Sequence, residues 1–282
     1  MTSPVVPDTA QAPPPPVAKF RSLVLAAMVV LLAVVLLFSA RQGTWVQLVV
    51  VALVQVACVL SWIVATDPPS RYFYGGVALA VAAAADVGAV LHDNPTLAPV
   101  GYALAGGLLL AIVGQLGRRD GRSDLTDAFG GTIALNVMVA GYAAALVLAR
   151  EDNRILGLGL LAVGSAVTLA RVIDIVPVGP RLHTRVPRSL LGLFVGLLAG
   201  VGVAVLAGAA RTELSPGLCV LAGLLGAGGG LIADLGMSVA EADDGQQVGA
   251  GDRSWLASAR GPLAAFAGAI PAVYVAAVLA SV

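Results

Sequence analysis

Charged residues are the first thing that this sequence lacks. Asp, Glu, Lys and Arg together make up 11% of its 282 residues, whereas they make up roughly 25% of a typical soluble domain. Hydrophobic residues account for 59%, and they fall in runs that are long enough to cross a lipid bilayer. The composition therefore excludes a soluble globular domain and predicts an all-α polytopic membrane protein.

Lysine, cysteine and histidine are also scarce, as are the motifs of common catalytic chemistry. The only lysine is Lys19, against fifteen arginines, a bias typical of high-GC bacterial genomes. The two cysteines lie inside separate apolar runs, so a disulfide framework is not expected. The sequence has no Walker loop, HExxH, GxSxG, Cys/His metal cluster or DDxxD motif. These absences leave few residues that could carry chemistry.

Stretches of about 20 mostly apolar residues predict nine transmembrane helices. They cover residues 22–40, 45–65, 72–91, 97–116, 128–149, 155–173, 189–210, 216–237 and 262–281. Residues 1–20 are Pro-rich and are expected to form a disordered cytoplasmic tail. Helices one to four then occupy residues 21–127, and helices five to nine occupy residues 128–282. The first helix is too long for the apolar part of a signal peptide and is expected to be retained.

The distribution of basic residues predicts the orientation, because cytoplasmic loops carry an excess of Lys and Arg. If the N-terminus is cytoplasmic, twelve of the sixteen basic residues lie on that side. The other four are Arg41, Arg150, Arg154 and Arg211. We therefore expect a multi-pass protein of the bacterial inner membrane with its C-terminus outside. The loops 117–127, 174–188 and 238–261 would face the cytoplasm and hold most of the polar side chains.

Three aspartates lie within or at the end of predicted spans, where a carboxylate is costly and indicates a functional site. For Asp86, near the outer end of the third span, snorkelling or pairing inside the bundle is the alternative to a functional role. Asp174 lies three residues after Arg171, so the two can form a local ion pair. Asp234 lies one turn before Ser238, and their oxygens could help to hold a divalent cation.

A basic cluster and a run of glycines follow the sixth predicted span. Arg181, Arg185 and Arg188 could bind phosphates through their guanidinium groups, although the positive-inside rule explains them equally well. The next span has a glycine at every fourth position, a pattern that favours close helix packing in membranes and also suits a homodimer. These glycines are Gly192, Gly196 and Gly200.

The order of these features along the chain is informative. Asp174 is followed by Gly179 and Arg181, and residues 186–189, Val-Pro-Arg-Ser, lead into the Gly-rich span. Residues 233–238 then read Ala-Asp-Leu-Gly-Met-Ser, and a proline lies in the middle of the last apolar run. Over about residues 136–282 the chain resembles the integral-membrane CDP-diacylglycerol synthases, or phosphatidate cytidylyltransferases. That family has a basic element before a Gly-rich helix, and Gly-Asp-Leu-x-x-Ser at the end of a later span.

The resemblance implies a CDP-diacylglycerol-synthase-like fold and a set of site residues. In an active enzyme of this kind, Mg²⁺ would be the cofactor, and CTP and a phosphatidate-type lipid would be the substrates. The metal would be held by Asp174, Asp234 and Ser238. The substrate phosphates would be bound by Arg181, Arg185 and Arg188.

The chain departs from the family in the segment that follows Ser238. The family's Lys-Arg pair falls on Glu241 and Ala242, and its His-Gly-Gly falls on residues 256–258. Its Asp-Arg-x-Asp falls on residues 261–264, where none of these residues is retained. Glu241 and the acidic residues after it would repel phosphates over about 8 Å at physiological ionic strength.

These departures predict a degenerate, non-catalytic member of this fold that acts as a scaffold or partner subunit in the bacterial cell envelope. Two alternatives stay open. One is an active, Mg²⁺-dependent nucleotidyltransferase with a rearranged site, and the other is a transporter of lipids or small molecules. The expected partners are membrane lipid and another membrane protein or a second copy of the chain. No nucleic-acid partner is expected.

Overall fold

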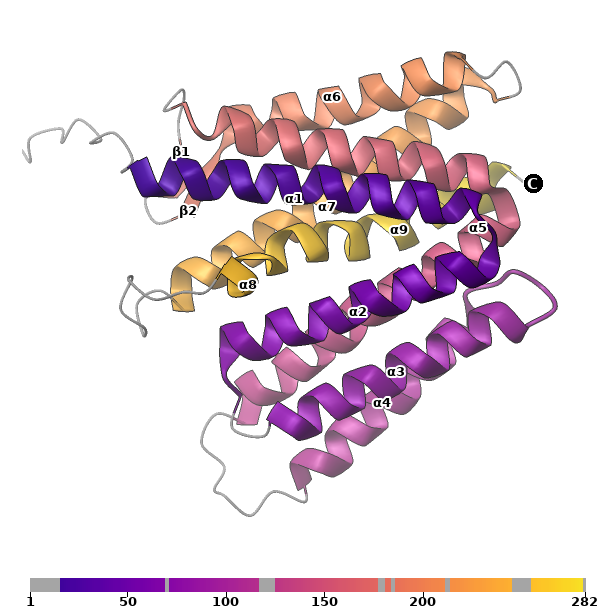
Figure 1. Ribbon diagram of the computed structural model, residues 1–282, viewed down its shortest axis with the longest axis vertical. Coiled ribbons are helices and arrows are strands. Elements are labelled where there is room, and N and C mark those ends of the chain that lie inside the picture. The colour runs from indigo at the N-terminus through magenta and orange to yellow at the C-terminus, as the bar shows by residue number, and fades with distance from the viewer. Residues whose placement is uncertain are drawn as a thin grey trace, which may run out of the picture.

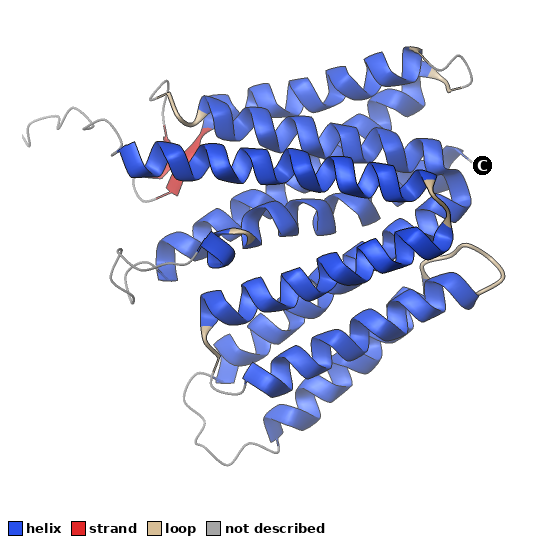
Figure 2. Ribbon diagram, viewed as in Figure 1, coloured by secondary structure: helices blue, strands red, loops and turns tan. Residues whose placement is uncertain are grey.

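A computed structural model describes most of the chain as helix. The described residues are 16–68, 71–116, 125–176, 181–183, 186–210, 214–244 and 255–280. The elements are α1 (Pro16–Arg41), α2 (Thr44–Thr66), α3 (Arg71–Leu91), α4 (Ala98–Leu116), α5 (Leu125–Ile173), β1 (Arg181–His183), β2 (Val186–Ser189), α6 (Leu190–Ala209), α7 (Pro216–Asp244), α8 (Trp255–Ser258) and α9 (Arg260–Ala280). Among the described residues, strand is confined to the β1–β2 pair (Figure 2).

Eight of the described helical stretches are long and apolar enough to cross a membrane. The stretch Ala128–Ile173 has 46 residues, which at 1.5 Å per residue is about 69 Å, roughly twice the 30 Å thickness of the hydrocarbon core. It consists of two helices that meet at Asp152, whose φ of −152° and ψ of 100° are not helical. The two arms correspond to the fifth and sixth predicted spans. The chain is therefore a polytopic helical membrane protein.

The break in α5 has a local cause in the side chain of Asp152. Its Oδ1 accepts hydrogen bonds from the backbone N–H groups of Arg154 at 2.8 Å and Ile155 at 3.4 Å. These N–H groups belong to the first turn of the second arm, where a helix has no backbone acceptors of its own. Asp152 thus acts as an N-cap, and it allows the chain to turn back into the membrane.

Replacing Asp152 by alanine is expected to lower the free energy of unfolding by about 1 kcal/mol, the usual loss for an N-cap. Unfolding of the purified protein in mixed micelles, followed by circular dichroism, measures the change. The adjacent substitution Glu151→Ala is the control, because Glu151 is exposed and makes no cap. Equal stability of the two variants would show that Asp152 does not set the break.

The two arms of α5 run through the middle of the bundle and organise it (Figure 1). This helix packs against α1, α2, α3, α4, α6, α7 and α9. The helices α3 and α4 pack against each other, and α6, α7 and α9 form a second group, in which α7 contacts both α6 and α9. The buried core contains many small residues, such as Ala162, Ala166 and Ala170, which let the helix backbones approach closely.

The connections between successive helices lie alternately at the two ends of the bundle. The start of α1, the β1–β2 hairpin and α8 lie at one end in Figure 1. The turn between α1 and α2, the break in α5 and the C-terminal end of α9 lie at the opposite end. The α1 helix therefore begins at one end of the bundle and α9 finishes at the other, as an odd number of membrane crossings requires.

Three expectations about the loops need correction. The segment 238–261 is not a loop throughout, because α7 continues to Asp244 and α8 begins at Trp255. Residues 239–244 contain no glycine or proline, so nothing in them stops the helix. The segment 174–188 is not a loop throughout either, because it contains β1 and all but the last residue of β2. The predicted tail ends earlier than residue 20, because α1 begins at Pro16, while residues 1–15 lie outside the described part.

Candidate functional site

The candidate site is centred on Asp234, which lies inside α7 and is 1% exposed. The backbone of α9 closes one side of it. A Cβ atom added to Gly261, at the start of α9, would lie 2.8 Å from Asp234 Oδ1 and 2.6 Å from Nη2 of Arg171. The glycine therefore leaves the space that these two side chains occupy.

Two arginines engage the two oxygens of the Asp234 carboxylate. Arg171, in the last turn of α5, donates from Nη2 to Oδ1. Arg188, in β2, donates from Nη2 to Oδ2. All three side chains are at most 8% exposed, so these charge-assisted hydrogen bonds lie almost wholly out of water.

Asp174, just after α5, completes the arrangement. Its Oδ2 accepts a hydrogen bond from Nη1 of Arg188 at 3.0 Å. Its Oδ1 accepts from the backbone N–H and the hydroxyl of Ser189, at 2.9 and 2.7 Å. Arg188 therefore bridges two carboxylates, and Arg171, Asp174, Arg188 and Asp234 form one connected set. We call these four residues the arginine–aspartate network.

The β1–β2 hairpin carries Arg188 into this position. The strands are antiparallel, with Arg181 opposite Ser189 and His183 opposite Val186, and β2 leads directly into α6. The Ser189 hydroxyl also accepts a hydrogen bond from the Gly192 N–H at 2.9 Å and caps α6. Burial lowers the pKa of Arg188 to about 10, so its guanidinium remains charged at neutral pH.

Neighbouring groups tie the network to α1 and to the last turns of α7. Arg188 donates from Nε to the Ser238 hydroxyl at 3.2 Å, and this hydroxyl donates to the Asp234 carbonyl at 2.9 Å. From α1, Ser22 donates to the Arg171 carbonyl at 3.0 Å, and Arg21 pairs with Glu241 at 3.7 Å. The two arginines and two aspartates of the network balance in charge.

The structure brings together some of the predicted site residues and separates others. Asp174, Asp234, Ser238 and Arg188 meet in one place, although they come from different elements. The predicted local pair of Arg171 with Asp174 is wrong, because Arg171 pairs with Asp234 instead, 63 positions along the chain. The side chain of Arg181 and all of Arg185 lie outside the described part, so their role as phosphate ligands stays a prediction.

The carboxylates of the network do not fit a divalent cation. A bound Mg²⁺ needs open carboxylate oxygens, but guanidinium or serine groups already occupy both oxygens of Asp174 and of Asp234. Two arginine cations would also repel the metal. Within the described ranges, no group of three or more His, Cys, Asp or Glu side chains could hold a metal ion. The four residues of the network therefore do not form a metal site.

The predicted glycine face of α6 lies against α5 of the same chain. Added Cβ atoms at Gly192, Gly196 and Gly200 would lie 3.0, 2.6 and 2.7 Å from the carbonyl oxygens of Ala170, Ala166 and Ala162, respectively. Each glycine thus meets one turn of the second arm of α5. The face serves packing within the chain and holds the start of α6 beside Asp174.

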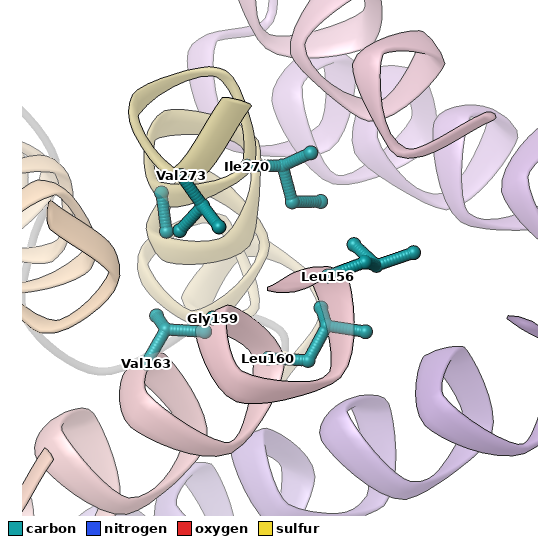
Figure 3. A pocket seen from close by; sticks show the side chains of 7 residues that line it. Leu156, Gly159, Leu160, Val163, Ile270 and Val273 are labelled. Atoms are coloured by element: carbon teal, nitrogen blue, oxygen red, sulfur yellow. The ribbon is translucent and has the colours of Figure 1, made fainter. Parts of the chain in front are cut away.

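An apolar pocket lies deeper in the bundle, between the second arm of α5 and α9 (Figure 3). The empty space there is about 160 Å³ with open solvent included, and it has no room for a water-sized molecule, so it is not a small-molecule site. The residues that line it are Leu156, Gly159, Leu160, Val163, Ala269, Ile270 and Val273. Because no polar group faces it, this pocket offers nothing to orient a phosphate or nucleotide.

Fold and site together define a multi-pass helical membrane protein with a buried, charge-balanced network at one end of the bundle. Comparison with the known protein families and with curated proteins found no match to this chain.

Proposed function

We propose that this chain is a non-catalytic membrane protein, a scaffold or partner subunit of the bacterial cell envelope built on a degenerate CDP-diacylglycerol-synthase-like fold. The observation that carries the proposal is the arginine–aspartate network. The two aspartates that would hold the metal in an active member are neutralised by arginines of the same chain. The site is therefore a structural contact rather than an open reaction centre.

The charges around the network support this interpretation. Nucleotidyl transfer depends mainly on cations and metal ions that are positioned around the phosphates. Arg171 and Arg188 are already paired with the aspartates, and Glu241 adds a negative charge close to both arginines. A substrate phosphate would have to displace buried pairs whose disruption typically costs about 3–5 kcal/mol.

The membrane setting follows from the same reasoning. We place the network at the cytoplasmic end, with the N-terminus inside and the C-terminus outside the bacterial inner membrane, because most basic residues then lie in the cytoplasm. The outward faces of α4 and α6 carry exposed apolar side chains such as Leu109, Val113, Phe194 and Leu206. These faces suit lipid or another membrane helix, which are the partners that a scaffold would have.

Purified protein in lipid vesicles with CTP, phosphatidate and Mg²⁺ is expected to form no CDP-lipid above the level of protein-free vesicles. The assay follows radiolabelled CTP into the lipid phase, and an active CDP-diacylglycerol synthase reconstituted in the same way is the positive control. Turnover that the substitution Asp234→Asn abolishes would refute the non-catalytic proposal and favour the nucleotidyltransferase alternative.

Purification from native membranes in a mild detergent tests the scaffold role directly. A membrane protein that co-purifies at fixed stoichiometry, and that is lost when Glu241 and Arg21 are both replaced by alanine, would support a partner at this end of the bundle. A chain that purifies alone and moves a lipid or small solute across vesicles would contradict the scaffold role and favour the transporter alternative.

A further inference from the structure

A third buried carboxyl group belongs to Asp86, in the half of α3 that lies farther from the end of the bundle with the β1–β2 hairpin. Asp86 is 4% exposed, so it does not snorkel to the surface. Its Oδ1 accepts a hydrogen bond from the side-chain amide of Gln55 in α2 at 2.9 Å. The same amide nitrogen donates to the carbonyl of Val139 in α5 at 3.0 Å. One glutamine thus joins three helices around the carboxyl group.

Asp86 differs from the other two buried aspartates in its partners. Asp174 and Asp234 are each paired with arginine. Among the residues that the structure describes, no basic side chain lies within ion-pairing distance of Asp86. A carboxylate that is removed from water and has no cation beside it is very costly. The group therefore needs a cation that none of the described side chains supplies.

The side chains of the surrounding helices supply no such charge. The α2 helix contributes amides and a thiol, and α4 has no charged residue along its length. The α5 helix contributes an amide, a phenol and Arg150, whose guanidinium is occupied by the carbonyls of Ala89 at 2.6 Å and His92 at 2.9 Å. Besides Asp86, the titratable or charged residues of the packed helices are Cys58 on α2, Arg71, Tyr72 and Tyr74 on α3, Tyr102 on α4, and Asp127, Tyr142, Arg150, Glu151, Asp152, Arg154 and Arg171 on α5, with His92 and Asp93 just after α3.

We propose that Asp86 is a proton-binding site inside the membrane. A proton from water neutralises the carboxylate and binds at Oδ2, because Oδ1 is the oxygen that accepts from Gln55. The nearer end of α3 is at Leu91, five residues and about 7.5 Å along the helix axis at 1.5 Å per residue. At that end Arg150 donates to the backbone carbonyls of Ala89, His92 and Asp93, so polar groups lie where a proton from water would enter. The site does not depend on whether the chain is catalytic.

Infrared spectroscopy of the full-length protein in lipid nanodiscs tests this proposal. At pH 7 the exposed carboxyl groups, with ordinary pKa values of about 4, are ionised and give no protonated-acid carbonyl band. We expect such a band from Asp86, with a downward shift in D₂O as its proton exchanges. The band should disappear in Asp86→Asn, which keeps an acceptor for Gln55, and should persist in Asp174→Asn.

Any one of four outcomes would overturn the proposal. A spectrum with no protonated-acid band at pH 7 shows that Asp86 is ionised, and a band that remains in Asp86→Asn comes from another group. A band that appears only in Na⁺-free buffer assigns the site to a metal cation and rejects the proton as its occupant. If Asp86→Asn does not fold, Gln55→Met must still move the band to higher frequency by removing the donor to Oδ1, and an unmoved band rejects the assignment.

Discussion

Replacing Asp234 by alanine is expected to destabilise the protein by about 3–5 kcal/mol, a large part of the stability of a typical domain. The substitution leaves Arg171 and Arg188 buried with Asp174 as the only remaining carboxylate of the network. The loss comes from an uncompensated buried charge rather than from the missing attraction alone. Unfolding in mixed micelles measures it, and Asp93→Ala is the matched control because Asp93 is exposed.

A compensating substitution separates this explanation from simple loss of packing. When Arg171→Leu is combined with Asp234→Leu, the unpaired charge disappears and Arg188 keeps its bond to Asp174 at 3.0 Å. The double variant should be more stable than Asp234→Ala, because apolar replacements of a buried ion pair are often neutral or stabilising. If the double variant unfolds as easily as the single one, charge balance does not explain the site.

The membrane helices could be predicted from the sequence because their signal is local. A run of about 20 apolar residues is sufficient to place a span, and every predicted span coincides with a described helix to within a few residues, except that α1 and α7 are longer. The break at Asp152 could also be located, because a short polar segment interrupts the apolar run there. Each helix, and the break at Asp152, is caused by residues within the segment itself.

The partners of the buried charges could not be predicted in the same way. Arg171 and Asp174 are close in sequence, so a local pair was the natural expectation. The observed pairs join residues 63 and 46 positions apart, and they depend on where the hairpin and α7 pack. Arg171, within the last turn of an apolar helix, was itself a signal, because a buried arginine requires a carboxylate. The spacing of residues along the sequence does not indicate which carboxylate pairs with Arg171.

Substituting Gly196 by leucine is expected to destabilise the protein by about 2–3 kcal/mol, at the upper end of typical overpacking costs. Even a Cβ atom at this position would lie 2.6 Å from the Ala166 carbonyl oxygen and 3.0 Å from the Ala170 Cβ. The helices α5 and α6 would have to separate, and Ser189 and Arg188 at the start of α6 would move away from Asp174. Unfolding in micelles measures the loss.

Gly202 provides a matched control on the same helix, because a Cβ atom there would meet nothing within 4 Å. Gly202→Leu should therefore leave the stability nearly unchanged. The pair of variants also decides how the glycine face is used. If Gly196→Leu keeps the stability of the chain but dissociates a homodimer in size-exclusion chromatography, the face joins two copies. If it destabilises the chain without such dissociation, the glycines act within the chain, where they hold the hairpin and the arginine–aspartate network in place.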